Sequence, residues 1–490
     1  MATALPAQAR HRWPDAALLA VGAVFLLLQV LLVPRPFGLS IDEATYLAKV
    51  DPAVPELVWT APRAWGVPVL AAPVALFSAG LTVLRAWFAL LASVGLVAAF
   101  WPWRRVLPPG VAPVAALFFA TFWVTLYYGS LAMPNLYVAL GAVGVTGLAL
   151  RYLQQPTRWR LLLAGAVVVL VALVRPTDSV LLVGPMVLVV LAAARLRDYR
   201  LVVALVVGGL LGWLPWLVEG WLRFGGPLAR LRAAETSGPQ GLELRLTNAV
   251  TVLRMLDGFP LYCCYGGPAE EAGGLPRLLS AWAIAVLLAA VAGLLLAARR
   301  GQLPEMLLVT VPAAALGGFY LLLPSFITLR FLLPALALLS LPVAAAVVLL
   351  LTGSRGRRRT LLAGLVVVAV VVHLGLMLPR AERMLREAQQ DRILALQLAD
   401  AVRPLTDGRP CLVLGTAPRA TSFYLRCAVR TKRPGKRPPS AYRRAQAEQR
   451  TVVAIVRGDQ AADSYLARWT RVPVEGLPGR WQVYLPPAGG

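Results

Sequence analysis

Residues 16–33 read AALLAVGAVFLLLQVLLV, an apolar run that contains no charged side chain. The run is close to the ~20 apolar residues that a helix needs to cross the hydrocarbon core of a bilayer. Because Arg10, His11 and Arg12 precede it, a cleaved signal peptide is the alternative. The run is long for the apolar region of a signal peptide, and the segment Pro34–Phe37 is a poor cleavage site. We therefore predict a retained first membrane span.

The composition of the chain indicates lipid as its solvent. Of the 490 residues, 59% are hydrophobic and 14% are charged, and the mean hydropathy is +0.70. Soluble domains carry about 25% charged residues, so a soluble globular protein is excluded. The net charge of +25 resides in short arginine-rich clusters between apolar runs, which is typical of loops that anchor spans. We expect membrane lipid as a partner and no nucleic acid, and the bias toward Arg, Ala, Leu and Gly indicates a bacterial source.

Apolar runs like the first recur along the chain and predict an α-helical polytopic membrane protein with about 11 transmembrane helices. We place the spans at residues 15–33, 83–102, 111–129, 135–151, 160–174, 179–195, 201–218, 278–298, 303–323, 331–351 and 360–379. The run 67–79 is shorter and contains Pro68 and Pro73. There we expect a helix at the outer membrane interface rather than a span.

Short basic clusters determine the predicted orientation. They comprise Arg10 and Arg12, Arg104 and Arg105, Arg151 with Arg158 and Arg160, Arg195 with Arg197 and Arg200, Arg299 and Arg300, and Arg355 with Arg357 to Arg359. All of them fall on one side of this topology, which is therefore cytoplasmic. We expect the plasma membrane as the location, with the N-terminus inside the cell. The predicted domains are a transmembrane domain at 1–379, with external loops 34–82 and 219–277, and an extracytoplasmic domain at 380–490.

The tail from residue 380 is polar and carries its apolar residues in short runs. Its pattern predicts helices at 381–402, 419–425 and 441–450, strands at 411–414, 451–456 and 481–485, and a mobile loop at 431–440. Strands that alternate with helices indicate a small α/β domain. Cys411 and Cys427 suit a disulfide in an oxidising compartment. Unpaired buried thiols are an equal alternative, because the chain has only 4 cysteines.

Two adjacent acidic residues, Asp42 and Glu43, follow the first span in the segment Ser40–Leu47. The plain interpretation is a solvated loop whose acids cap a helix that begins near Ala44, where the helix dipole favours negative charge. The alternative is chemical, because the predicted topology puts both carboxylates at the outer membrane surface. Short motifs decide little by themselves, so the choice depends on the order of the motifs that follow.

After the acidic pair come the interfacial run 67–79 and Arg85, which opens the second span. Further on, a span ends in Arg175-Pro176-Thr177-Asp178, and a later one begins with Arg330-Phe331-Leu332-Leu333-Pro334. In this order and sidedness the chain resembles the GT-C superfamily of integral membrane glycosyltransferases, and within it the branch of protein O-mannosyltransferases and aminoarabinose transferases. The resemblance extends over residues 15–350 in outline. Phe331 replaces the tyrosine that is usual in the family.

The resemblance implies an inverting GT-C glycosyltransferase that moves a sugar from a polyprenyl-phosphate donor to an acceptor hydroxyl at the outer face of the membrane. It implies that Asp42 is the general base, and that Glu43 is a helper, a metal ligand or a helix cap. A divalent cation, Mg²⁺ or Mn²⁺, held by Asp42 and Glu43 is the cofactor it suggests. Arg330 and Arg175 are candidates to bind the leaving phosphate, since the arginine fork suits phosphate, and Arg85 is a further one. For all three, snorkelling at the interface is the alternative.

One position departs from the family pattern. The family often has a second acidic residue at the start of the fourth span, where this chain has Asn135. The amide oxygen of Asn135 can coordinate a cation or bind substrate but carries no charge, which weakens the case for a metal. Asp178 or another external acid is a candidate to compensate for it.

The loop 219–277 is a candidate lid or acceptor site, with Tyr262–Gly267 as its most unusual stretch. A zinc site is not expected, because ordinary cysteine spacing is missing and the only histidines are His11 and His373. Two other functions stay open. One is a transporter or flippase, which would call for internal repeats and charges at mid-membrane, and the other is a non-catalytic GT-C relative. The acceptor that the resemblance implies is a glycan, a glycolipid or a protein of the cell envelope.

Overall fold

The computed structural model describes residues 7–55, 57, 59–236, 242–256, 278–406, 408–431, 434–458, 460–461, 464–474, 476 and 479–487. The chain forms two compact units. The helical unit comprises Met1–Leu32, Thr60–Gly66 and Phe88–Met384, and the mixed unit comprises Val33–Trp59, Val67–Trp87 and Leu385–Gly490. The mixed unit therefore combines most of the predicted first external loop with the C-terminal domain.

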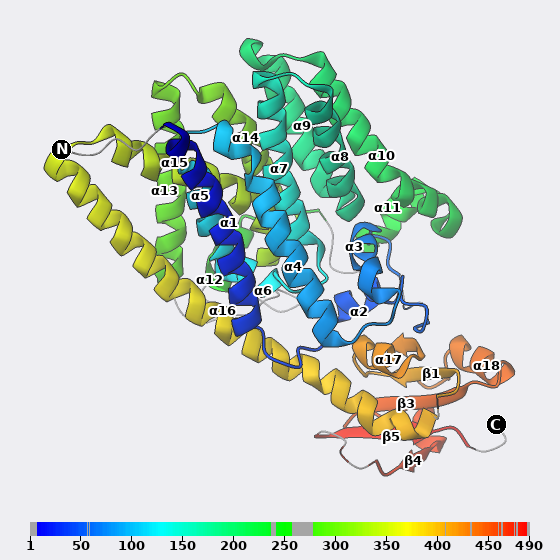
Figure 1. Ribbon diagram of the computed structural model, residues 1–490. Coiled ribbons are helices and arrows are strands. Elements are labelled where there is room, and N and C mark those ends of the chain that lie inside the picture. Colours follow the sequence, from blue (N-terminus) through cyan, green and yellow to red (C-terminus); the bar gives the residue numbers. More distant parts are fainter. Residues whose placement is uncertain are drawn as a thin grey trace. The chain divides into compact units, whose positions relative to one another are not determined.

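The helical unit is built from helices (Figure 1). Many of these helices are apolar, as the hydropathy pattern predicts. Its elements are α1 (Ala7–Leu32), most of α4 (Leu81–Phe100), η1 (Pro102–Arg105), α5 (Val111–Ala120), α6 (Trp123–Tyr128), α7 (Pro134–Gln154), α8 (Arg158–Val174), α9 (Pro176–Ala192), η2 (Ala194–Leu196), α10 (Tyr199–Phe224), α11 (Pro227–Thr236), α12 (Thr247–Leu256), α13 (Leu278–Arg299), α14 (Leu303–Leu322), η4 (Leu329–Leu332), α15 (Leu333–Gly353) and the first part of α16 (Gly356–Thr406). The mixed unit contains the short helix α2 (Ile41–Leu47) and most of α3 (Gly66–Ala75).

Eight helices of the described residues are long and apolar enough to cross a membrane. They are Trp13–Leu32, Leu81–Arg105, Pro134–Gln154, Tyr199–Phe224, Leu279–Arg299, Leu303–Leu322, Leu329–Gly353 and Gly356–Thr406. Shorter apolar helices are Gly66–Ala75, Val111–Ala120 and Pro176–Ala192. The chain is thus a helical multi-pass membrane protein, as predicted. The predicted count of about 11 spans is not confirmed.

The segment 111–129, predicted as one span, consists of two helices, α5 and α6. Phe122 between them has an extended backbone (ψ 129°), which interrupts the helix. The hydroxyl of Thr121 donates to the carbonyl of Leu117 (2.6 Å) and shares a hydrogen bond with Nε2 of His373 (3.0 Å). Side chains that bond the local backbone in this way compete with regular helix geometry. Apolar composition alone gave no sign of this interruption.

The last predicted span, 360–379, and the predicted tail helix, 381–402, are one continuous helix, α16, of 51 residues. Pro379 lies inside α16 and does not end it. A proline in a helix interior removes a backbone hydrogen bond and costs about 3 kcal/mol. Ala381 and Met384, just beyond the proline, are buried, and we attribute the continuity of the helix to this packing.

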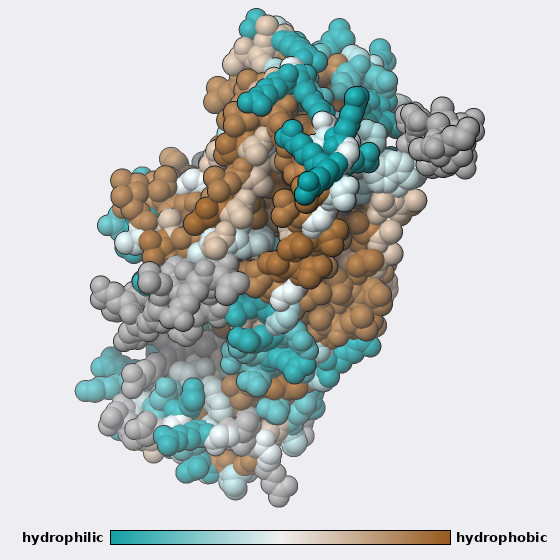
Figure 2. Space-filling model, turned by 90° about the vertical axis from the view of Figure 1, so that its left-hand side faces the viewer, coloured by the Kyte–Doolittle hydropathy of each residue, from teal (hydrophilic) through white to brown (hydrophobic). Residues whose placement is uncertain are grey.

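Apolar side chains cover the outside of the helical unit as well as its inside. In α16, Leu361, Leu365 and Val368 have helical spacing and expose 59%, 64% and 59% of their surface. Figure 2 shows hydrophobic side chains gathered into broad areas of the molecular surface. An exposed apolar surface of this extent is typical of contact with lipid.

The C-terminal part of the mixed unit is a five-stranded sheet with helices, which confirms the predicted α/β domain (Figure 1). Its strands are β1 (Cys411–Gly415), β2 (Ala428–Thr431), β3 (Thr451–Arg457), β4 (Thr470–Val472) and β5 (Trp481–Leu485), in the order β2-β1-β3-β5-β4. β1 pairs parallel with β2 and β3, whereas β5 pairs antiparallel with β3 and β4. The sequence pattern did not predict β2 and β4, which are short strands at the two edges of the sheet.

Helices cover both faces of this sheet. The residues of β3 alternate between the two faces, as the period of a strand requires. Val453 and Ile455 belong to the apolar cluster formed with α16, whereas Val452 and Val456 belong to the cluster formed with α18 (Ser440–Ala447) and η5 (Tyr465–Arg468). This double burial explains why β3 reads as a continuous apolar run in the sequence.

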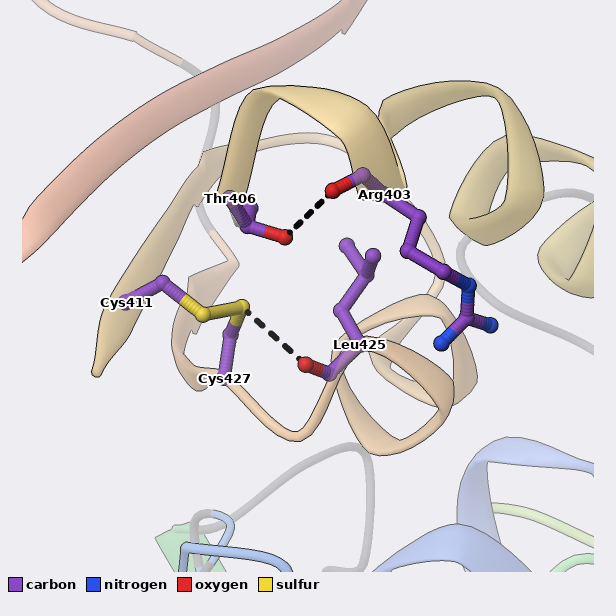
Figure 3. Close-up of a disulfide and its surroundings, with 5 residues drawn as sticks. All are labelled: Arg403, Thr406, Cys411, Leu425 and Cys427. Atoms are coloured by element: carbon purple, nitrogen blue, oxygen red, sulfur yellow. Dashed lines mark hydrogen bonds between the residues drawn. A yellow bond between two sulfur atoms is a disulfide. The ribbon is translucent and has the colours of Figure 1, made fainter. Parts of the chain in front are cut away.

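A disulfide joins Cys411 at the start of β1 to Cys427 just before β2. Of the two alternatives that the sequence left open, the structure therefore has the bridge. Figure 3 shows the bridge near the last turn of α16, where the hydroxyl of Thr406 donates to the carbonyl of Arg403 (2.9 Å). The bridge closes a chain segment that contains α17 (Arg419–Leu425), and both cysteines share an apolar cluster with α16.

Close contact between two helices of the helical unit depends on glycine. A Cβ atom on Gly293 in α13 would lie 1.8 Å from the carbonyl oxygen of Pro342 in α15. We predict that Gly293→Ala forces α13 and α15 apart and lowers the free energy of unfolding by about 1–3 kcal/mol. Thermal unfolding of the purified protein in detergent measures the effect. Gly364→Ala on α16, where a Cβ meets open space, is the control, and equal midpoints for both variants would contradict the close contact.

Candidate functional site

The acidic pair lies on α2, a short helix with a complete capping box. The hydroxyl oxygen of Ser40 accepts a hydrogen bond from the backbone N–H of Glu43 (3.3 Å), and the carboxylate of Glu43 accepts one from the backbone N–H of Ser40 (3.0 Å). The pattern Ser-x-x-Glu produces this reciprocal cap. The expected helix start near Ala44 is therefore corrected: the helix begins at Ile41, and Ser40 is its N-cap.

Asp42 occupies the second position of α2, and its side chain is half-buried. The positive end of the helix dipole lies at this position and favours a negative charge. Asp42 is thus held in the first turn of a capped helix. A carboxylate in a fixed position is what a general base requires.

Glu43 is fully buried and faces two guanidinium groups. Arg85 of α4 forms an ion pair with its Oε1 atom, and Arg392 of α16 lies 2.7 Å from its Oε2 atom. Burial by itself raises the pKa of Glu43, but the two positive charges and the hydrogen bonds outweigh it and lower this pKa to about 2. Since this value lies below the usual 4.5, the ionised carboxylate stabilises the fold fully above pH 4.5. That contribution is lost as the pH falls through about 2.

The same two arginines hold the segment that precedes α2. Arg85 donates to the carbonyls of Phe37 (3.1 Å) and Gly38 (2.6 Å), and Arg392 donates to the carbonyl of Gly38 (3.2 Å). The ring of Phe37 lies 5.2 Å from the guanidinium of Arg85 and 4.5 Å from that of Arg392. We name Phe37, Gly38, Glu43, Arg85 and Arg392 the arginine clamp. Because the donors of Arg85 serve the clamp, we do not assign this residue to a phosphate.

The clamp does not fit the divalent cation that the resemblance suggests at Asp42 and Glu43. Both carboxylate oxygens of Glu43 already face guanidinium groups, whose charge repels a cation. Within the described part of the chain, no group of three or more His, Cys, Asp or Glu side chains is placed to hold a metal ion. We therefore do not assign Glu43 to a metal ion.

A second polar cluster lies in the helical unit, between the end of α8 and the start of α9. Asp178, in the first turn of α9, is fully buried and accepts a hydrogen bond from the hydroxyl of Tyr320 at the end of α14. Arg175 donates to the hydroxyl oxygen of Tyr320 (2.8 Å), and its Nε atom lies 3.3 Å from Oδ2 of Asp178. The buried carboxylate and the tyrosine thus fix the orientation of Arg175, whose side chain is 21% exposed.

Arg330 shares an aromatic neighbour with Arg175. The guanidinium of Arg175 lies 4.7 Å from the ring of Phe331, and that of Arg330 lies 5.7 Å from the same ring. Phe331 also stacks on Tyr320, with ring centroids 4.9 Å apart. Two arginines that the sequence suggested for phosphate binding are therefore gathered around Phe331.

Asn135, at the start of α7, is only 1% exposed. Neither its amide nitrogen nor its amide oxygen has a hydrogen-bond partner among the residues that the structure describes. A buried polar group without a partner costs about 1–3 kcal/mol, so the amide of Asn135 calls for an explanation. Asn135 therefore stays a candidate for contact with substrate.

The described part of the loop 219–277 is anchored rather than loose. Arg230 of α11 is fully buried and donates to the carbonyls of Ala61 (3.0 Å) and Trp216 (2.6 Å) and to the carboxylate of Glu219 (2.9 Å). The role of this loop as a lid or acceptor site stays a prediction. The stretch Tyr262–Gly267 lies outside the described residues.

The predicted site residues divide between the two units, and each group stands on its own geometry. The mixed unit holds Asp42, Glu43 and Arg85, and the helical unit holds Asn135, Arg175, Asp178 and Arg330. Sequence reasoning missed Tyr320, Arg392 and Tyr424, whose hydroxyl accepts a hydrogen bond from the backbone N–H of Leu39 (2.7 Å). The only available signal for Tyr320 was a polar group near the predicted outer end of an apolar span, the same side on which Asp178 was expected.

No protein-family model and no curated protein matches the sequence, whereas solved structures match nearly the whole chain. ArnT from Cupriavidus metallidurans, bound to undecaprenyl phosphate, is similar with a TM-score of 0.65 and 14% identity over 96% of this chain and 98% of that one. ArnT is a GT-C aminoarabinose transferase. This chain has the GT-C fold.

Two further structures extend the GT-C comparison. The oligosaccharyltransferase AglB from Archaeoglobus fulgidus, in complex with an inhibitory peptide and a dolichol-phosphate, has a TM-score of 0.55 and 13% identity over 93% of this chain and 72% of that one. The arabinofuranosyltransferase AftD from Mycobacteria has a TM-score of 0.51 and 16% identity over 98% of this chain and 40% of that one. The GT-C fold predicted from the order of the motifs is confirmed.

We predict that Glu43→Gln destabilises the protein more than Arg392→Gln does. Loss of the carboxylate leaves Arg85 and Arg392 facing each other in a buried site, and breaking a buried ion pair from one side costs roughly 3–5 kcal/mol. The double variant Glu43→Gln with Arg392→Gln recovers part of this loss, since it removes one of two like charges. Thermal unfolding in detergent measures all three. A double variant less stable than Glu43→Gln alone would show that the clamp is not held by charge.

Proposed function

We propose that the protein is a membrane glycosyltransferase that transfers a sugar from a polyprenyl-phosphate donor to a hydroxyl group of an acceptor. The observation that supports this best is the cluster of Arg175, Asp178 and Tyr320 in a chain of GT-C fold. A guanidinium group held by a buried carboxylate and a tyrosine is pre-organised to stabilise a leaving phosphate. The similar structures bound to undecaprenyl phosphate and dolichol-phosphate carry ligands of this class.

In the proposed reaction Arg175 and Arg330 act on the leaving group. The bond between the anomeric carbon of the sugar and the phosphate oxygen breaks, and the phosphate leaves with the electron pair. The polyprenyl phosphate gains negative charge in this step, and the two guanidinium groups stabilise it. Asp178 and Tyr320 do not touch the donor; they hold Arg175 in place.

Asp42 acts on the acceptor. Its carboxylate takes the proton from the acceptor hydroxyl while the hydroxyl oxygen forms the new bond to the anomeric carbon. Attack from the side opposite to the phosphate inverts the configuration at that carbon. Glu43 takes no part in the transfer because the clamp engages both of its oxygens. The unsatisfied amide of Asn135 binds a sugar hydroxyl or a phosphate oxygen.

The proposed location is the plasma membrane, with the N-terminus in the cytoplasm and the C-terminal domain outside. The disulfide between Cys411 and Cys427 supports this orientation, because structural disulfides persist in oxidising compartments. The acceptor that fits this side is a glycan, a glycolipid or a protein of the cell envelope.

Thiol labelling tests the orientation. Ile41, beside Asp42, is 50% exposed, and Trp159, in a predicted cytoplasmic loop, is 81% exposed. In a background with Cys263 and Cys264 replaced by serine, we predict that Ile41→Cys reacts with a membrane-impermeant maleimide on intact cells. Trp159→Cys reacts only after the cells are made permeable. The reverse pattern would place Asp42 on the cytoplasmic side and remove the basis of the proposed reaction.

Loss of activity tests the chemistry. We predict that Asp42→Asn lowers turnover by roughly 10²–10⁴-fold, the usual contribution of a general base. Mass spectrometry of envelope glycans and glycolipids from a deletion strain that carries each variant measures the product. The control Asp400→Asn removes an exposed carboxylate of the mixed unit and leaves the product unchanged. Unchanged product with Asp42→Asn would favour a non-catalytic relative instead.

A further inference from the structure

We propose that the C-terminal domain is a positioning element for the reaction, and that Arg392 and Tyr424 are its positioning residues. This inference rests on the proposed function, because the segment that the two residues hold leads directly into α2 and Asp42. Neither residue contacts donor or acceptor in this proposal. Each acts through the backbone of residues 36–43.

Side chains of the C-terminal domain bond nearly every position of the segment before α2. Gln389 donates to the carbonyl of Pro36 (3.2 Å), and Arg392 donates to the carbonyl of Gly38 (3.2 Å) and covers the ring of Phe37. The backbone N–H of Leu39 donates to the hydroxyl of Tyr424 on α17 (2.7 Å). Contacts of this density define one path for the chain between the first helix and α2.

The segment also approaches α16 too closely for a side chain at one position. A Cβ atom on Gly38 would lie 2.7 Å from the carbonyl oxygen of Arg392. The backbone of the segment therefore packs directly against the backbone of α16. The side chain of Arg392 also forms an ion pair with Glu43. Glu43 in turn belongs to the capping box that starts α2.

α2 depends on such support because it is short. Its 7 residues are far below the ~12–15 residues that an isolated helix needs in water. The position of Asp42 is consequently set by the cap and by the side chains that hold the cap. Two of these, Arg392 and Tyr424, come from the C-terminal domain, whose core contains none of the proposed reacting groups.

The disulfide lies close to both helices that carry the positioning residues, α16 and α17. Cys427 follows α17, the helix of Tyr424, after a single residue, and both cysteines pack in the apolar cluster that includes Leu398 and Val402 of α16. Arg392 lies on the same helix, α16. The bridge therefore lies in the apolar cluster against which the helices of both positioning residues pack.

Two independent perturbations test the proposal in the full-length protein. Arg392→Gln removes the guanidinium, and Arg403→Gln, an exposed arginine on the same helix, is its control. Gly38→Ala disturbs the contact from the side of the loop without changing any charge. Gly80→Ala, where a Cβ meets open space, is its control.

Two measurements are made on each variant. Hydrogen–deuterium exchange reports the protection of residues 37–48, with β3 as an internal check that the domain is folded. Turnover with a polyprenyl-phosphate sugar gives kcat and KM. We expect Arg392→Gln and Gly38→Ala to raise exchange in residues 37–48 and to lower kcat roughly 10- to 100-fold, as a misplaced catalytic group does. The KM for the donor stays within about twofold because donor contacts are intact, and Arg392→Lys recovers part of kcat.

Three results would overturn the proposal. A fall in kcat with unchanged exchange would mean that Arg392 acts on the substrate itself. Raised exchange with normal kcat would mean that the loop does not serve the reaction. A proportional rise in the KM for the donor would make Arg392 a binding residue. Failure of the proposed function is seen separately, as full activity of Asp42→Asn, while the exchange measurement still reports whether the C-terminal domain holds the loop.

Discussion

Lipid offers neither hydrogen bonds nor counter-charges, and this constraint governs where the protein keeps its polar groups. The backbone satisfies its N–H and C=O groups by hydrogen bonds within helices. Charged side chains meet it by pairing inside the protein, as Arg175 does with Asp178 and Tyr320. The proposed chemistry draws on these same pairs, because a guanidinium that is already held by a buried carboxylate needs little rearrangement when a phosphate develops charge beside it.

Much of the fold was predictable from the sequence, since apolar periodicity is the signal on which helices and buried strands depend. The bounds of α17 and β5 agree with the prediction, and β1 and β3 differ from it by one residue at an end. The differences arise where distant packing overrides local pattern. Pro379 predicts a helix end, but α16 continues past it, and we attribute this to the packing of the buried residues that follow. Phe122 lies in an apolar run, but a polar contact of the preceding Thr121 with His373 accompanies a break there.

The candidate site was predictable in its members more than in their roles. The order and sidedness of short motifs, through the resemblance to the GT-C superfamily, identified Asp42, Glu43, Arg175, Asp178 and Arg330. Contacts between residues far apart in the sequence produce no local pattern that would identify them. Glu43 was a candidate for metal binding until Arg392 was seen beside it, and Tyr320 is one of 13 tyrosines with no local pattern to mark it.

The ion pair between Glu43 and Arg392 joins residues 349 positions apart. A ribosome makes Glu43 long before it makes Arg392. During most of translation the acidic loop lacks its second guanidinium, and a chain that stops before α16 never obtains it. The acidic segment around α2 is therefore completed only after the chain has been made as far as α16.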